Sequence, residues 1–169
     1  MAGMECTNWL RSARGSSDSA GADGAPALRD AAQILARAQA DEAAADEARE
    51  RYRTQPHAML EPDARIAPLL AAGEHVVAVR RSALLDRREP AVGSDVPTGL
   101  AGDLYLTPRR LVLVGRRTLS FELDGIEEVM LAGERLLIVM RDGEGVSLGV
   151  AQPRLLRVEI AAARVAASG

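Results

Sequence analysis

The sequence is poor in several residue types, and each scarcity narrows what the protein can be. Aromatic side chains are few, one Trp, two Tyr and one Phe among 169 residues, so a core has to be built from Leu, Val and Ile. Lysine is missing, and every basic residue is Arg. Together with abundant Ala, Gly and Val, this indicates GC-rich codon usage and a bacterial source. No apolar run approaches the roughly 20 residues that a membrane-spanning helix needs.

The single cysteine, Cys6, cannot form a disulfide within the chain, so a reducing, intracellular environment is expected. The N-terminus also lacks the charged start and apolar stretch of a secretory signal. The sequence therefore predicts a cytoplasmic protein, peripheral at the inner membrane face if it binds lipid. Its formal net charge of −3 is mild. Because binding of nucleic acid requires a basic face, no nucleic-acid partner is expected.

Composition divides the chain into three parts. Residues 1–26 are rich in Gly, Ser, Ala and Asp, and they are predicted to be disordered because they cannot bury enough surface to offset their chain entropy. Residues 27–60 form a helical extension rich in Ala, Glu and Arg, with a helix predicted over 27–54 between two prolines. Large apolar residues stop after Ala38, so the second half of this helix is expected to project into solvent or pack weakly. Residues 61–169 form the third part.

This third part is predicted to be a small α+β domain that is mainly β. A short helix over 62–72 comes first, and a helix over 152–167 with one apolar stripe closes the domain. Between them, short apolar or alternating segments separated by turn signals predict a small antiparallel barrel or sandwich. The one long connection, residues 83–101, is expected to be a mobile loop. The seven predicted strands are residues 75–79, 103–107, 111–114, 119–123, 126–131, 136–140 and 146–150.

No group of residues has the spacing of an active site or a metal site. His57 and His75 are the only histidines, and no Cys, Asp or Glu residues accompany them at the spacing of a metal-ligand set. Ser120 and Ser147 fall at outward positions of alternating strands, and neither lies in a Gly-x-Ser-x-Gly motif. We therefore expect no catalytic residue, no cofactor and no metal.

Part of the domain resembles a known family. Residues 102–114 read Gly-Asp-Leu-Tyr-Leu-Thr-Pro-Arg-Arg-Leu-Val-Leu-Val, which resembles the Gly-x-Leu-x-Leu-Thr-x-x-Arg-Leu signature of bacterial PH-like and GRAM-type domains. Residues 119–129 resemble the hairpin that follows, and residues 69–76 resemble the usual entry into the first strand. The resemblance covers roughly residues 65–167. It implies a PH-like, seven-stranded antiparallel barrel capped by a C-terminal helix and preceded here by an N-terminal helical extension.

The resemblance also implies non-catalytic binding of a protein partner or of a second copy of the chain. The 83–101 loop, an exposed barrel edge or the groove beside the C-terminal helix would serve as the binding surface. The helix over 27–54 would tie the module to a partner or to another copy of itself. Some relatives bind phosphoinositides or other lipids, so the alternative is peripheral binding to an anionic lipid surface.

Arginine residues are the candidate binding residues. In lipid-binding PH domains, a basic cluster lies on the first two strands and their loop, where four arginines fall in this sequence. Four others flank one predicted strand and are expected to come close in a hairpin, either as an anion-binding edge or as a solubilising edge that discourages strand pairing. The eight candidates are Arg80, Arg81, Arg87, Arg88, Arg109, Arg110, Arg116 and Arg117.

Overall fold

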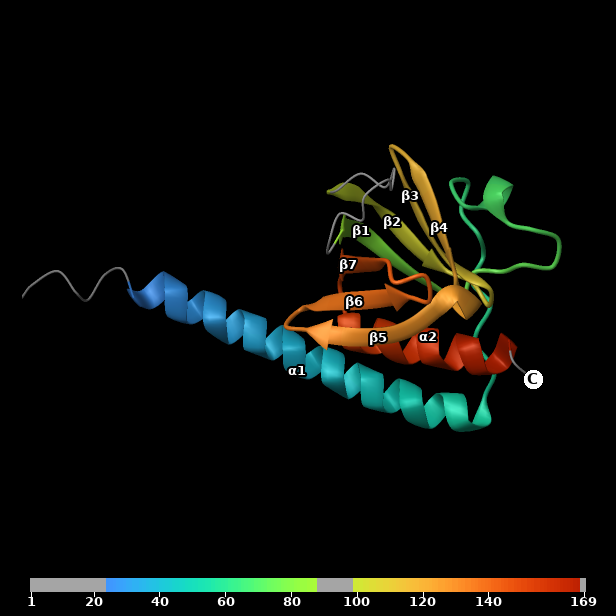
Figure 1. The fold of residues 1–169 in the computed structure, drawn as a ribbon. Coiled ribbons are helices and arrows are strands. Elements are labelled where there is room, and N and C mark those ends of the chain that lie inside the picture. The colour runs from blue at the N-terminus through green and yellow to red at the C-terminus, as the bar shows by residue number, and fades with distance from the viewer. Residues whose placement is uncertain (1–23, 88–98, 168–169) are drawn as a thin grey trace, which may run out of the picture. The chain divides into compact units, whose positions relative to one another are not determined.

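A computed structural model of the chain describes residues 24–87 and 99–167. The tail predicted to be disordered therefore lies almost wholly outside the described residues. Two α-helices, α1 (Gly24–Thr54) and α2 (Pro153–Ala167), flank the strands in sequence (Figure 1). The strands are β1 (Ala78–Arg87), β2 (Leu100–Leu106), β3 (Arg110–Gly115), β4 (Thr118–Glu122), β5 (Ile126–Ala132), β6 (Arg135–Met140) and β7 (Gly145–Gly149).

All seven strands belong to one antiparallel sheet with the order β4-β3-β2-β1-β7-β6-β5. The predicted seven strands and the C-terminal helix are thus confirmed. The sheet is not closed, because β4 and β5 are its two edges and do not pair with each other. A short 3-10 turn, Leu123–Gly125, carries the chain from one edge to the other. The architecture is therefore an open version of the predicted barrel.

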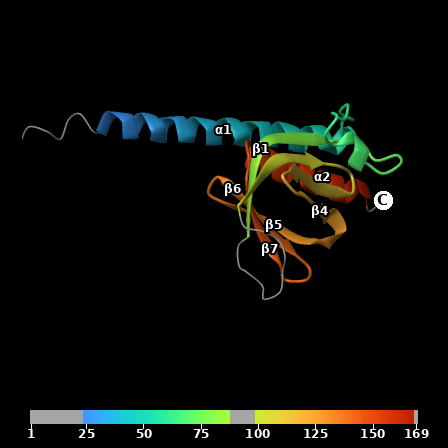
Figure 2. The same ribbon diagram turned by 90° about the horizontal axis from the view of Figure 1, so that it is seen from above.

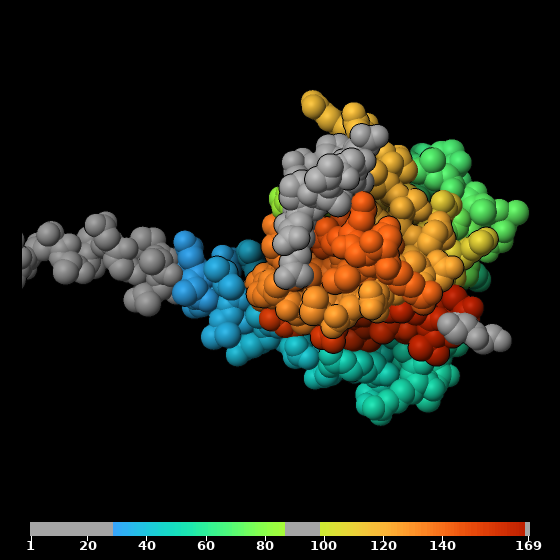
Figure 3. Space-filling view, viewed as in Figure 1, coloured from blue at the N-terminus to red at the C-terminus, as the bar shows by residue number. Residues whose placement is uncertain are grey.

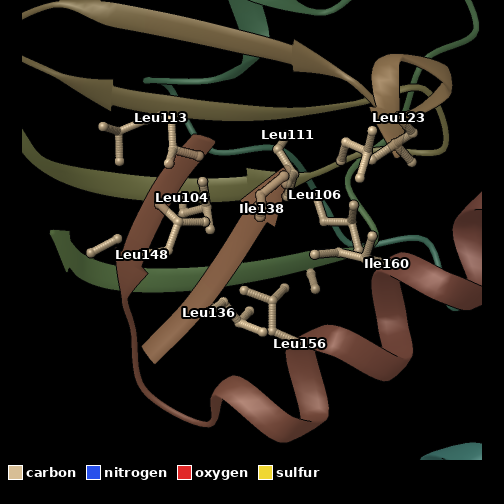
Figure 4. Packing of buried hydrophobic residues seen from close by; sticks show 14 of the residues in the cluster. Leu104, Leu106, Leu111, Leu113, Leu123, Leu136, Ile138, Leu148, Leu156 and Ile160 are labelled. Atoms are coloured by element: carbon tan, nitrogen blue, oxygen red, sulfur yellow. The ribbon is translucent and has the colours of Figure 1, made fainter. Parts of the chain in front are cut away.

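The main core lies on one face of the sheet, beneath α2. Leu104 and Leu106 of β2 point into this core, as the alternation of side chains along a strand requires. Leu156 and Ile160, spaced by one helical turn, bring one face of α2 onto the same cluster (Figure 4). Leu111, Leu113, Leu136, Ile138 and Leu148 complete its buried centre.

A second apolar cluster covers the opposite face of β2 and β3. Tyr105 and Val112 point to this side, and both are almost completely buried. Ile66 and Val76 cover them from the segment between α1 and β1, which is green in Figure 2. The helix predicted over 62–72 is wrong, because only a 3-10 turn, Ala67–Leu69, forms there. Two prolines in this stretch explain its shortness, since proline removes a helical hydrogen bond and clashes with the preceding turn.

The first strand starts later than predicted. β1 begins at Ala78, and residues 83–87 of the predicted loop belong to it, where they pair with β2 and β7. The pairing shifts between Arg80 and Ala83, and Ser82 has a φ of 56°. Such a bulge interrupts the period of two that identifies strands in a sequence. Residues 88–98 of the predicted loop lie outside the described residues, and its residues 100 and 101 belong to β2.

The chain divides into two compact units, Met1–Arg37 and Ala38–Gly169. The second half of α1 thus folds with the sheet, and three of its residues are buried: Asp41 at 3%, Ala45 at 0% and Ala48 at 1% exposure. The expectation that this half projects into solvent is therefore wrong. Small side chains let the helix approach closely without large apolar residues, so hydrophobic periodicity gave no signal.

Candidate functional site

Arg80 is buried inside the domain. This β1 residue is 8% exposed, and its Nη2 donates a hydrogen bond of 2.7 Å to Oε2 of Glu159 in α2. Burial raises the pKa of the Glu159 carboxyl, and the charge of Arg80 opposes that rise. The pair joins the first strand to the last helix, so this candidate residue is occupied by an internal partner.

Arg81 is held by two carboxylates on the other face of the sheet. Its guanidinium donates 2.8 Å hydrogen bonds to Asp63 and to Asp103. The Tyr105 hydroxyl also donates to Asp63, at 2.8 Å, and Arg81 together with this hydroxyl lowers the pKa of Asp63 to about 2. Arg65 adds a 2.6 Å bond to Asp103. The network fixes the α1–β1 segment to β1 and β2.

Arg110 holds the α1–β1 segment to the start of β3 and to the turn before it. Its Nε and Nη2 donate to the two carboxylate oxygens of Glu74 at 2.9 and 2.8 Å, and Nη2 also donates to the carbonyl of Leu69 at 2.8 Å. The buried Thr107 hydroxyl donates to Glu74 at 2.8 Å and accepts the backbone N–H of Arg110 at 3.0 Å. Chiefly the bond from Arg110, helped by the Ala71 N–H and the Thr107 hydroxyl and opposed by burial, lowers the pKa of Glu74 from its ordinary 4.5 to about 2.

Replacing Glu74 with Gln is expected to lower the free energy of unfolding by about 1 kcal/mol at neutral pH, because a charge-assisted hydrogen bond becomes a neutral one. The pKa of Glu74 is depressed in the folded chain, so its contribution is complete above about pH 4.5 and is lost as the pH falls towards 2. Urea denaturation from pH 7 to pH 2 should show the two proteins converging in that window. Glu61→Gln, an exposed carboxylate nearby, is the control; a difference that persists unchanged at pH 2 would contradict the assignment.

The remaining candidate arginines do not form one cluster. Arg109, Arg116 and Arg117 are exposed, and their guanidinium groups have no partner among residues 24–87 and 99–167. Arg110 starts β3 and Gly115 ends it, so the two basic pairs lie about 17 Å apart along the strand. The expectation that they come close in a hairpin is wrong. Arg110 faces Glu122 of β4, whereas Arg116 and Arg117 follow the other end of β3. The Arg87 side chain and Arg88 lie outside the described residues.

The sequence predicted an exposed edge as one possible binding surface but did not show which strand forms it, and the structure places an open edge at β5. Ala132 and Arg135 face each other across the two-residue turn between β5 and β6, and such a turn is closed by a hydrogen-bonded pair. Along β5, residues whose backbone is hydrogen-bonded to β6 then alternate with residues whose backbone is not. The backbone of Met130 is therefore hydrogen-bonded to β6. Val129 and Leu131 direct their backbone N–H and C=O groups away from β6, where the described residues provide no further strand.

The side chains of this edge are unusually apolar for an unpaired strand. Val129, Met130 and Leu131 are consecutive and all partly exposed, and the first and third pack on the main core. Along the β4 edge, exposed polar residues such as Ser120 instead alternate with partly buried apolar residues. Natural edges are usually protected by charges, prolines or bulges. On β5 only the first half is protected, by a bulge and by Glu127 and its neighbour.

Part of β5 lies at the surface of the domain. Figure 3 shows β5 and β6 (orange) at the surface of this face, with α2 (red) directly below them. Helix α2 contacts β5 and the turn that precedes it.

The histidines do not form a metal site. His57 packs its ring against Tyr52 with centroids 4.4 Å apart, and burial lowers its pKa. In the described part of the chain, no three His, Cys, Asp or Glu side chains are grouped to hold a metal ion. None of the helices described there combines the length and the apolar character needed to cross a bilayer.

The antiparallel strand order and the single C-terminal helix on the core define a protein of PH-like fold. No family model and no curated protein matches the chain. Among solved structures, the Vps36 N-terminal PH domain is similar at 18% identity, covering 66% of this chain and 96% of its own, with a TM-score of 0.48. The pleckstrin homology domain of USP37 has 15% identity, coverages of 52% and 96%, and a TM-score of 0.40. A C-terminal domain of an unknown protein from Leishmania infantum has 16% identity, coverages of 61% and 90%, and a TM-score of 0.40.

Proposed function

We propose that this chain is a non-catalytic interaction module that binds a protein partner in extended conformation along β5. The observation that carries the proposal is the unpaired backbone of Val129 and Leu131. Four hydrogen-bonding groups at these two residues point away from β6. An added strand would satisfy them, as in other cases of recognition by strand addition.

The side chains along the edge set the character of the partner. Met130 points to the face opposite the core, and its flexible apolar side chain is partly exposed. Glu127 and Glu128 precede it and are exposed. A partner strand that fits carries an apolar residue opposite Met130 and a basic residue towards the two glutamates.

Selection of extended peptides from a displayed random library tests this function. A peptide that binds the full chain should slow amide hydrogen exchange at Val129 and Leu131. Met130→Lys should weaken its binding at least tenfold, because a lysine on the edge opposes strand addition. Ser120→Lys, the same change on the β4 edge, should leave binding within twofold. Peptides that protect other amides, or that bind both variants equally, would place recognition elsewhere.

Binding of anionic lipid through Arg80, Arg81, Arg87 and Arg88 is the alternative function, and it has less support. Arg80 is buried against Glu159, and Arg81 is already paired with two aspartates. Recruiting either guanidinium to a phosphate would break those bonds. Salt-sensitive binding to vesicles of phosphatidylserine that is lost when Arg87 and Arg88 are replaced by Glu would favour lipid over peptide.

Four finer assignments belong to the same proposal. The motif over residues 102–114 supports membership of the bacterial GRAM-type group, and the absence of Lys supports a bacterial source. The lone Cys6 supports a cytoplasmic location. Association of two copies through the same β5 edge is the self-binding form of the function.

A further inference from the structure

The second half of α1 is attached to α2 by a carboxylate. Asp41 accepts hydrogen bonds from the backbone N–H groups of Arg154 and Leu155, at 2.8 and 3.0 Å. These are the second and third residues of α2, whose N–H groups have no acceptor within their own helix. Such groups are ordinarily capped by the residue just before the helix. Here the cap comes from another helix, and the Asp41 side chain is 4% exposed.

The rest of this contact is small and polar. Ala45 and Ala48, one and two turns after Asp41, are buried. No larger apolar side chain of residues 38–54 is fully buried, and Tyr52 is only partly covered. Because alanine removes little apolar area from water, the hydrophobic contribution to this attachment is low. The segment is therefore held mainly by the Asp41 cap and by charges.

Helix α2 carries a further apolar stripe on the flank of its core-facing side. Leu155, Val158 and Ala162 recur at helical spacing and are partly buried. On the other flank Arg157 and Ala161 are exposed. The bonds that Asp41 accepts from Arg154 and Leu155 place residues 38–54 beside the start of this stripe. Removing the segment would leave an apolar stripe beside two free N–H groups.

The charges around the stripe favour an acidic occupant. Arg154 lies at its start and forms ion pairs with Asp41 at 3.6 Å, with Glu42 at 3.4 Å and with Glu134 of the β5–β6 turn at 3.0 Å. The positive end of the α2 dipole points the same way. An occupant therefore needs a carboxylate at this end and small residues one and two turns later.

We propose that residues 38–54 are a displaceable cover over a second protein-binding face on α2, and that this face binds an acidic amphipathic helix. The partner repeats the pattern Asp-x-x-x-Ala-x-x-Ala that Asp41, Ala45 and Ala48 present in the cover. Binding requires the cover to leave, so the face is closed in the free protein. This proposal uses a different surface from β5 and does not depend on peptide binding there.

Native-state hydrogen exchange on the full, unmodified chain tests the displacement. The amides of residues 42–54 and of Leu155 should exchange at least tenfold faster than the slowest amides of β2 and β3, through an opening that leaves the sheet folded. If they exchange only together with β2 and β3, the segment is an integral part of the core and the proposal is overturned.

A labelled synthetic peptide of residues 38–54 tests the partner chemistry by fluorescence anisotropy. Asp41→Arg should free the face, so this variant should bind the peptide at least tenfold more tightly than the wild type. Asp46→Arg, which reverses an exposed carboxylate of the same helix, should bind it like the wild type. A peptide with Ala in place of Asp41 should bind the freed chain at least tenfold more weakly than the intact peptide. Equal binding to all three chains, or equal binding of both peptides, would overturn the proposal.

Discussion

Replacing Glu159 with alanine is expected to lower the free energy of unfolding by about 3–5 kcal/mol, the range for breaking a buried ion pair from one side. Both side chains of the Arg80–Glu159 pair are 9% exposed, and the guanidinium is 2.7 Å from the carboxylate. Alanine at this position would leave the Arg80 charge buried without its partner. Chemical denaturation at neutral pH measures the loss.

The double variant Arg80→Met, Glu159→Leu separates the pair from its surroundings. It removes both charges while keeping apolar volume, so most of the lost stability should return. Glu50→Ala is the matched control, because Glu50 pairs with Arg53 on the exposed side of α1 and such a pair contributes about 0.5 kcal/mol. If Glu159→Ala is no more destabilising than this control, the pair is not desolvated in solution.

Replacing Gly115 with alanine is expected to destabilise the domain by about 3 kcal/mol, the upper end of the usual range for overpacking. Gly115 faces Gly102 across β2 and β3, and a Cβ on Gly115 would overlap the carbonyl oxygen of Ala101. The obstacle is backbone, which cannot move aside like a side chain. The end of the β2–β3 pair would have to separate.

Gly149→Ala is the control for this change. It is also a strand glycine, but a Cβ there would meet its nearest atoms at 3.7 Å, an ordinary contact. Its stability should change by less than about 0.5 kcal/mol. Thermal unfolding of both variants checks the contrast. Equal effects would mean that loss of glycine, rather than the close approach of the strands, determines the outcome.

The later strands and α2 were predictable because each has one buried face. Leu119 and Phe121 alternate with polar residues along β4, and Leu156 and Ile160 repeat at one helical turn in α2. β1 was misplaced for the opposite reason. Val76 packs in one apolar cluster and Val77 in the other, so the sequence before β1 shows a continuous apolar run instead of alternation.

The candidate site was less predictable because it depends on partners that are distant in sequence. Arg80 looked like a solvent-facing cation, but Glu159 lies 79 positions later and neutralises it. The exposed backbone of Val129 depends on which strand ends the sheet, and local sequence does not contain that information. The only local signal was the apolar run Val129-Met130-Leu131 directly after two glutamates.

The cap that Asp41 provides also orders events during translation. Leu155 is synthesised 114 positions after Asp41, so the two N–H groups that bind this carboxylate do not yet exist when α1 leaves the ribosome. All seven strands emerge in between. A contact between such distant positions also closes a long loop, which makes it a slow step. During this whole interval residues 38–54 have no α2 to bind. They are therefore available to any other protein surface that binds an acidic helix and that the nascent chain meets.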